Sequence, residues 1–273
     1  MNQKANYRIE RLLLDATSEL GFSGDVIIGE SKSDAIAMAK EMSSESNANC
    51  QHMVFFVDGS RVLKPKNKSQ SSITHGESEL VAHLGAAVVY KSFQSSQGWQ
   101  ERHFALPNEQ CSTLAELFAI AHGLAVATEE VMILRSQDNI GPGRMATGHS
   151  VVIFSDSTSA LEQVRKLREK EAVTNAQVIS DPIIRKLVTR SQYLHRIGVR
   201  VELRWVPGHS GVEGNLRADA AALQAAKAQD MSVHIDEGLR LIELEAISKT
   251  TNKQPPSPER QQKEKPATKK ETY

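Results

Sequence analysis

The segment around His209 joins a mobile titratable side chain to a fixed carboxylate. His209 stands between Gly208 and Ser210-Gly211, and Asp219 follows ten residues after the histidine. The glycines allow the histidine segment to move, whereas Asp219 falls in an Ala-rich run with strong helix propensity. A loop can bring a proton carrier to a reacting group, and a helix holds a carboxylate in place. This division of roles suits phosphodiester chemistry, in which a metal ligand stays fixed while a proton moves.

Three further carboxylates stand at the ends or beginnings of predicted elements. Asp58 ends an apolar run, Asp156 ends a buried-type strand, and Glu116 lies in the first turn of a predicted helix. In sheets that carry helices on their faces, binding sites form beyond the carboxyl ends of the strands. If the strands before Asp58 and Asp156 are adjacent, these two side chains would therefore lie close together. Close carboxylates repel one another unless cations neutralise them, and Mg²⁺ prefers oxygen ligands. Two Mg²⁺ ions, with Mn²⁺ as a substitute, could hold the attacking and leaving oxygens of a phosphodiester.

Each of these residues also has a purely structural interpretation. Asp58 fits an ordinary turn signal, and Asp156 and Glu116 fit helix caps. His209 could be an exposed loop residue, and Asp219 could complement a helix dipole. The coincidence of all four carboxylates with site-forming positions favours the functional interpretation.

The elements that must position these residues follow a regular order along the chain. Hydrophobic periodicity predicts three strands, a helix, a strand, two helices, a strand and a final helix. This order predicts an α/β fold with a mixed five-stranded sheet and helices on both faces. The predicted strands span 53–57, 84–90, 100–106, 150–155 and 199–206, and the predicted helices span 112–127, 157–169, 181–196 and a run from 215.

Composition divides the chain into four segments. Residues 1–50 are predicted to form a helical leader of unknown role, residues 51–229 the catalytic domain, and residues 230–252 a C-terminal helix. Residues 253–273 lack an apolar pattern, so a disordered tail is predicted there. An insertion at 61–82 begins with a basic run, either a solvated loop or a phosphate-contacting arm. Residues 161–200 hold nine Arg and Lys against four Asp and Glu, which favours phosphate contacts.

Net charge, cysteine content and apolar runs indicate in which cellular compartment the protein is expected. The formal net charge is zero, so overall charge gives no indication of a nucleic-acid partner. Cys50 and Cys111 form neither a disulfide framework nor a zinc-ligand spacing, which indicates a reducing compartment. The N-terminus lacks a signal-peptide core, and no apolar run of 18 residues is present. We expect an intracellular monomer, nuclear or cytoplasmic, that is neither secreted nor membrane-spanning.

Four sequence pieces occur in an order shared with a known family. They are Val57-Asp58-Gly59-Ser60, Leu114-Ala115-Glu116-Leu117, Ser155-Asp156-Ser157, and the run from Trp205 to Gly211 that continues to Asn215, Ala218 and Asp219. With these pieces, spread over residues 52–228, the chain resembles the type 1 ribonuclease H family. The resemblance is closest to the ribonuclease H domains of retroelement reverse transcriptases.

The resemblance implies a ribonuclease H-like fold and an endoribonuclease that cuts the RNA strand of an RNA–DNA hybrid. It implies that Asp58 bridges two metal ions and that Asp219 completes one of the metal sites. Glu116 and Asp156 would complete the other site, and His209 would assist proton movement or product release. The residues implied to contact the substrate are Gly59, Ser60, Ser112, Thr113 and Asn215.

The chain departs from the family pattern at two places. Many relatives have amide side chains where this chain has Ser112 and Thr113, and hydroxyls reach less far into the minor groove of a hybrid. Many relatives also have an acidic residue where this chain has Leu216. Neither change removes a metal ligand.

Two other functions are compatible with the fold: a catalytically silent retroelement descendant that binds nucleic acid or protein, and another nuclease or transposase.

Overall fold

The computed structural model describes residues 21–44, 52–65, 80–92, 98–106, 111–137, 149–169 and 181–228. Three predicted features lie outside these ranges: residues 1–20 of the helical leader, the C-terminal helix at 230–252 and the tail at 253–273. The described residues belong to one unit of the chain, Met1–Val233.

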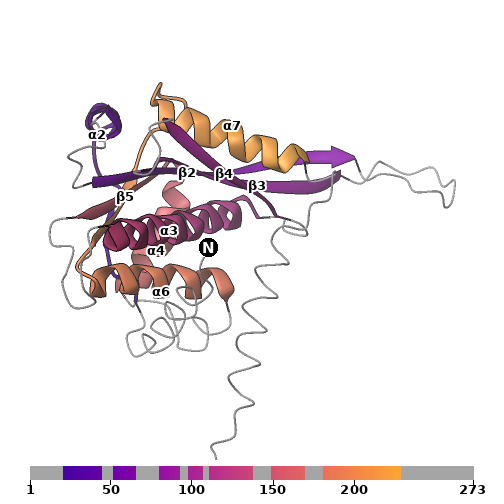
Figure 1. The fold of residues 1–273 in the computed structure, drawn as a ribbon. Coiled ribbons are helices and arrows are strands. Elements are labelled where there is room, and N and C mark those ends of the chain that lie inside the picture. The colour runs from indigo at the N-terminus through magenta and orange to yellow at the C-terminus, as the bar shows by residue number, and fades with distance from the viewer. Residues whose placement is uncertain are drawn as a thin grey trace, which may run out of the picture. The chain divides into compact units, whose positions relative to one another are not determined.

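A mixed sheet of six strands forms the centre of this unit, in the order β1-β6-β5-β2-β3-β4 (Figure 1). The strands are β1 (Asp25–Ile27), β2 (His52–Pro65), β3 (Leu80–Lys91), β4 (Trp99–Leu106), β5 (Ser150–Ser155) and β6 (Arg200–Trp205). β1, β6, β5 and β2 pair in parallel, whereas β2, β3 and β4 pair antiparallel.

The sheet has one strand more than the five that the sequence predicts. The additional strand is β1, which pairs in parallel with β6 through Val26 and Leu203. β1 is only 3 residues long, too short to show the alternation by which a strand is identified in a sequence. It lies within the segment that was assigned to a leader.

β2 is longer than predicted, and Asp58 therefore lies inside it. The parallel pairing of β2 with β5 ends at Phe56, opposite Phe154. The antiparallel pairing with β3 continues to Pro65, opposite Leu80. Asp58 thus lies just beyond the point where β2 stops pairing with β5, in the part of β2 that pairs with β3 alone. Both ends of the predicted insertion at 61–82 are therefore strand, because β2 and β3 pair their backbone groups there.

Helices cover both faces of the sheet, as predicted (Figure 1). On one face lie α3 (Ser112–Gln137), α4 (Thr158–Glu169) and α6 (Pro182–Arg196), which share a hydrophobic cluster with the sheet. On the other face lie α2 (Lys32–Ser44) and α7 (Glu213–Ala228), and a second cluster contains residues of both helices.

The central helix α3 is longer and more apolar than an ordinary amphipathic helix. Its segment Ser112–Arg135 has the length and composition of a membrane-spanning helix, yet 72% of the apolar window is buried inside the protein. An apolar helix of this kind is accounted for by burial in a core. α3 therefore serves as the support on which Glu116 is placed.

Candidate active site

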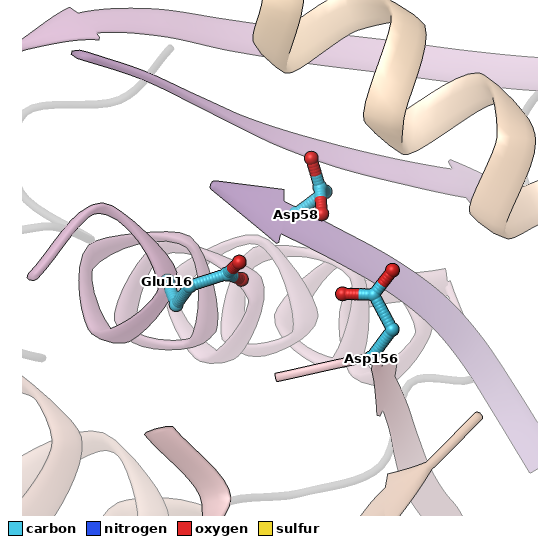
Figure 2. Close-up of side chains that lie close together, drawn as sticks. All are labelled: Asp58, Glu116 and Asp156. Atoms are coloured by element: carbon cyan, nitrogen blue, oxygen red, sulfur yellow. The ribbon is translucent and has the colours of Figure 1, made fainter. Parts of the chain in front are cut away.

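Three of the predicted carboxylates meet where the parallel pairing of the central strands β2 and β5 ends. Asp58 comes from β2, Glu116 from the first turn of α3, and Asp156 directly follows β5. Figure 2 shows their side chains directed toward one another, and one carboxylate oxygen of each lies within 4.8 Å of the others. Residues far apart in the sequence thus form a compact set of oxygen ligands.

Gly59 allows the helix that carries Glu116 to approach β2. A Cβ atom at this position would lie 2.5 Å from the Glu116 nitrogen and 2.6 Å from the Ala115 carbonyl carbon. The Gly59 N–H donates a hydrogen bond to Glu116 Oε2 at 3.1 Å. Only glycine fits here without moving α3. The hydrogen bond of Glu116 goes to β2, which differs from the helix cap that was considered as an alternative.

Three residues between the end of β6 and the first turn of α7 lie against Asp156. The Asn215 amide Nδ2 donates to Asp156 Oδ2 at 3.3 Å, and the Trp205 indole N–H donates to the Asp156 carbonyl oxygen at 3.3 Å. A Cβ atom on Gly208 would lie 2.8 Å from Asp156 Oδ2. The roles of Trp205 and Gly208 were not predicted, although both lie in the stretch that carries the family resemblance.

The buried position of Asn215 determines what it can contact. Its side chain is placed inside the fold at 3% relative exposure, and its Oδ1 atom has no hydrogen-bond partner among the described residues. In this structure the amide contacts Asp156. The contact with substrate that the resemblance implies for Asn215 stays a prediction.

Asp219 and His209 lie together on the α7 side of the cluster. The distance from His209 Nδ1 to Asp219 Oδ2 is 3.8 Å, and the exposed fractions of the two side chains are 82% and 41%. His209 has a φ of 52° and is the one non-glycine residue with positive φ in the described part of the chain. This conformation is uncommon for a residue with a Cβ and points to a constrained loop. The Ser210 hydroxyl closes the loop by donating to the Pro207 carbonyl at 2.6 Å.

The carboxylates of the cluster destabilise each other's charged forms. Burial, followed by the charges of Asp156 and Asp219, raises the pKa of Asp58 to about 7. Burial, followed by the charges of Asp58 and Asp156, raises the pKa of Glu116 to about 9. Asp219 also contributes to the raised pKa of Glu116, although it lies outside the closest group of three. A divalent cation would remove this penalty, and an all-oxygen set of ligands suits a hard cation.

The other predicted substrate residues lie on the two elements that carry Asp58 and Glu116. Ser60 is half-buried on β2, while Ser112 is exposed and Thr113 half-buried at the N-terminal end of α3. They are within a few residues of Asp58 or Glu116 in the sequence. The contacts with substrate that the resemblance implies for them stay a prediction.

The basic bias of residues 161–200 is partly neutralised by ion pairs. On α4, Arg165 contacts Glu162 at 2.7 Å and Glu169 at 3.7 Å, and Arg168 contacts Asp25 at 2.9 Å. Exposed pairs of this kind are weak and can be exchanged for other partners. The phosphate contacts that the sequence favours for this helix stay a prediction.

The family model for RNase H matches residues 50–227. The chain belongs to the RNase H family. The predicted α/β class and family are thus confirmed, with six strands in place of five. No curated protein matches the chain.

Several solved RNase H structures are similar to this chain at low identity. LC9-RNase H1, a type 1 RNase H with the type 2 active-site motif, has 16% identity and a TM-score of 0.36, with coverage of 67% of this chain and 76% of that one. The N-terminal RNase H domain of a Mycobacterium tuberculosis protein, fused to maltose-binding protein, has 20% identity, a TM-score of 0.36 and coverage of 64% and 98%. The foamy viral protease-reverse transcriptase in complex with RNA/DNA hybrid has 18% identity and a TM-score of 0.36, with coverage of 64% and 20%.

Proposed function

We propose that this RNase H family member is an endonuclease that hydrolyses the RNA strand of RNA–DNA hybrids with two divalent metal ions. The observation that carries the proposal is the convergence of Asp58, Glu116 and Asp156 within 4.8 Å of one another. A partly buried group of acids is unfavourable in the absence of a cation, and hard divalent cations prefer carboxylate ligands. Asp219 and His209 extend the group on its α7 side.

The four carboxylates divide between two metal positions in this proposal. Asp58 lies at the centre and would contact both ions. Glu116 and Asp156 would complete one position, and Asp219 would complete the other. When bound, a pair of Mg²⁺ ions supplies charge neutralisation and activation of water for in-line displacement at phosphorus. Mn²⁺ also accepts oxygen ligands and would serve as a substitute.

The protein side chains have further roles beyond metal binding. Asn215 donates to the Asp156 carboxylate and Trp205 to its backbone carbonyl. Together they would limit the orientations in which Asp156 binds an ion. His209 is exposed on a loop beside Asp219, so it can exchange protons with solvent and with the reacting phosphate. The hydroxyls of Ser60, Ser112 and Thr113 would contact the hybrid near the scissile bond.

Cleavage of defined duplexes tests this function. A labelled RNA–DNA hybrid is incubated with the full chain beside double-stranded RNA, double-stranded DNA and single-stranded RNA, in Mg²⁺, in Mn²⁺ and in chelator. We expect cleavage of the hybrid's RNA strand alone, and only with a divalent ion. Asp58→Asn, purified in parallel, controls for contaminating host nucleases. Hybrid binding without cleavage would instead support the catalytically silent alternative.

A further inference from the structure

Helix α2 belongs to the hydrophobic core although it precedes the part of the chain that matches the family model. The match begins at residue 50, and α2 spans Lys32–Ser44. Ala35 and Ala39 are fully buried. Ala39 is a member of the second hydrophobic cluster, and half-buried side chains of α2 pack against that cluster: Ile36, Met38 and Met42.

The same cluster contains the residues that flank the His209 loop. Val206 precedes the loop, Val212 follows it, and Ala218 is next to Asp219 in α7. All three are completely buried. Between these anchors lie Pro207, which is buried, and then Gly208, His209, Ser210 and Gly211, so the apolar support of the loop comes from its two ends.

Phe56 joins the parts of this cluster. Its ring stacks on Phe154 at a centroid distance of 5.1 Å and meets Trp99 edge-on at 5.9 Å. Gly214, in the first turn of α7, lies so close to the Phe56 ring that any Cβ there would collide with it. The start of α7 and the cluster covered by α2 are therefore tightly packed against one strand, two residues before Asp58.

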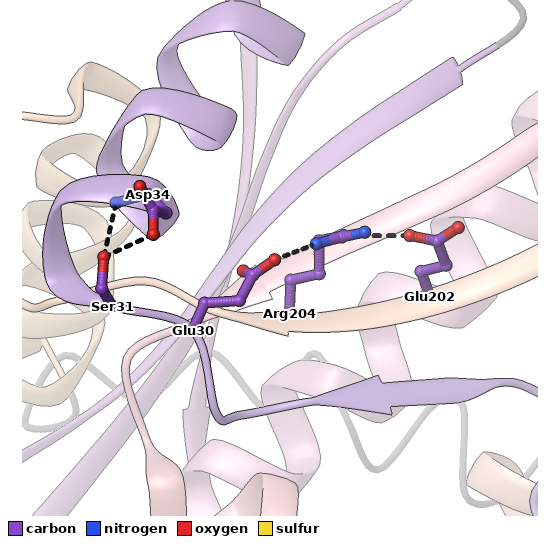
Figure 3. A network of polar contacts seen from close by, with 5 residues as sticks. All are labelled: Glu30, Ser31, Asp34, Glu202 and Arg204. Carbon is purple, nitrogen blue, oxygen red and sulfur yellow. Dashed lines mark hydrogen bonds and ion pairs between the residues drawn. The ribbon is translucent and has the colours of Figure 1, made fainter.

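Polar contacts tie the region of α2 to the strand that enters the loop. Arg204, on β6, contacts Glu30 at 2.8 Å and Glu202 at 2.9 Å (Figure 3). The exposed fractions of the three side chains are 14%, 28% and 10%, in the order Arg204, Glu30 and Glu202. Because these charges are largely screened from water, losing one partner costs more than it would at the surface.

The two ends of α2 are also held. At its start the Ser31 hydroxyl accepts from the Asp34 N–H at 3.2 Å and donates to the Asp34 carboxylate at 2.6 Å. At its end Lys91 Nζ donates to the Ser43 carbonyl at 2.6 Å, and the same ammonium lies 4.9 Å from the centre of the Trp99 ring. α2 is thus fixed to β3 and to the aromatic part of the second cluster.

From these contacts we propose that residues 21–44 are a positioning element for the catalytic loop. α2 completes the buried cluster that anchors Val206 and Val212, and the Glu30–Arg204 pair fixes the strand that leads into the loop. Without this element the loop would lose its fixed ends, and Phe56 and Phe154, which belong to the same cluster, would lose a packing neighbour. The catalytic consequence rests on the proposed function, whereas the structural consequence does not.

A matched pair of substitutions on α2 tests the proposal in the full chain. Ala39→Lys places a charge in the second cluster, and Ala37→Lys places the same charge at an exposed position of the same helix. The first readout is hydrogen exchange of the Val206 and Leu216 amides, which donate to Ser155 and Val212 across the two ends of the loop. We expect at least tenfold faster exchange of these amides in Ala39→Lys alone, with the amides of α3, whose buried residues belong to the first cluster, unchanged.

Glu30→Gln provides a milder variant in case Ala39→Lys does not fold. It removes the charge that faces Arg204 and keeps the shape of the side chain, and Glu41→Gln on the exposed side of α2 is its control. We expect Glu30→Gln to lower kcat by about threefold or more with KM within twofold, because the loop acts after the hybrid is bound. Mn²⁺ affinity, measured by electron paramagnetic resonance, should stay within twofold of wild type.

Two outcomes would overturn the positioning role. One is faster exchange spread evenly over the sheet, which would make α2 a general stabiliser. The other is unchanged exchange at Val206 and Leu216 in both Ala39→Lys and Glu30→Gln. Hydrogen exchange is measured without substrate, so the two proposals can fail separately. If wild type cleaves no hybrid, yet Ala39→Lys speeds exchange at Val206 and Leu216, the proposed function is refuted and the positioning role stands.

Discussion

Replacing Asp58 with asparagine removes the charge at the centre of the carboxylate cluster and almost preserves its shape. The pKa of Asp58 is raised from 3.8 to about 7, chiefly by burial and then by the charges of Asp156 and Asp219. A carboxyl with a raised pKa in the folded state makes unfolding easier as the pH rises through that range. At pH 8 the ionised side chain lowers the free energy of unfolding by up to about 4 kcal/mol, because each unit by which the pKa is raised corresponds to about 1.4 kcal/mol.

Thermal unfolding in chelator measures this cost. Asp58→Asn should melt at least about 4 °C above wild type at pH 8, if half of that cost is recovered at about 2 °C per kcal/mol. The difference should vanish near pH 4, where the wild-type carboxyl is protonated. Added Mg²⁺ should stabilise wild type more than the variant, because a ligand that binds only the folded state raises its stability. Hybrid cleavage by the variant should be lost.

Asp25→Asn serves as the control for removing a carboxylate charge, and two results for Asp58→Asn would refute the roles given to Asp58. Asp25→Asn removes the same type of charge from an exposed ion pair with Arg168, so its melting temperature should change by no more than about 2 °C. A lower melting temperature for Asp58→Asn than for wild type, in chelator at pH 8, would refute the electrostatic argument. Cleavage within about tenfold of wild type would refute the metal-ligand role.

Three further predictions concern the same site. His209→Ala should lower turnover by at most about 10⁴-fold and keep hybrid affinity within twofold in gel-shift titrations, whereas loss of binding would make the histidine a substrate contact. Asn215→Ala should weaken Mg²⁺ affinity by about 10–100-fold in calorimetric titrations, because Asp156 loses its hydrogen-bond donor, and an unchanged affinity would contradict that role. Mg²⁺ affinity should rise between pH 6 and pH 9 as Asp58 and Glu116 lose protons, with proton release seen in paired buffers of different ionisation enthalpy. An affinity independent of pH would count against the raised pKa of these carboxyls.

Local signals in the sequence were sufficient for much of the fold. β5 is predicted and observed at Ser150–Ser155, because six apolar and small residues without turn signals form a strand that is buried on both faces. α6 begins after Asp181, whose carboxylate accepts from the backbone of its first turn as a cap should. The carboxylates Asp58, Glu116 and Asp156 could be identified as a group because each stands next to such a locally determined element.

Tertiary structure alone decided the features that depend on distant parts of the chain. β1 is a strand because β6 offers an open edge, and β2 continues beyond Gly59 because β3 pairs with it. The Glu30–Arg204 pair joins residues 174 positions apart, for which no local pattern exists. The contact of Asn215 with Asp156 and the raised pKa of Asp58 likewise arise from burial. Pairing and burial are properties of the assembled chain, so a periodicity read over a few residues does not contain them.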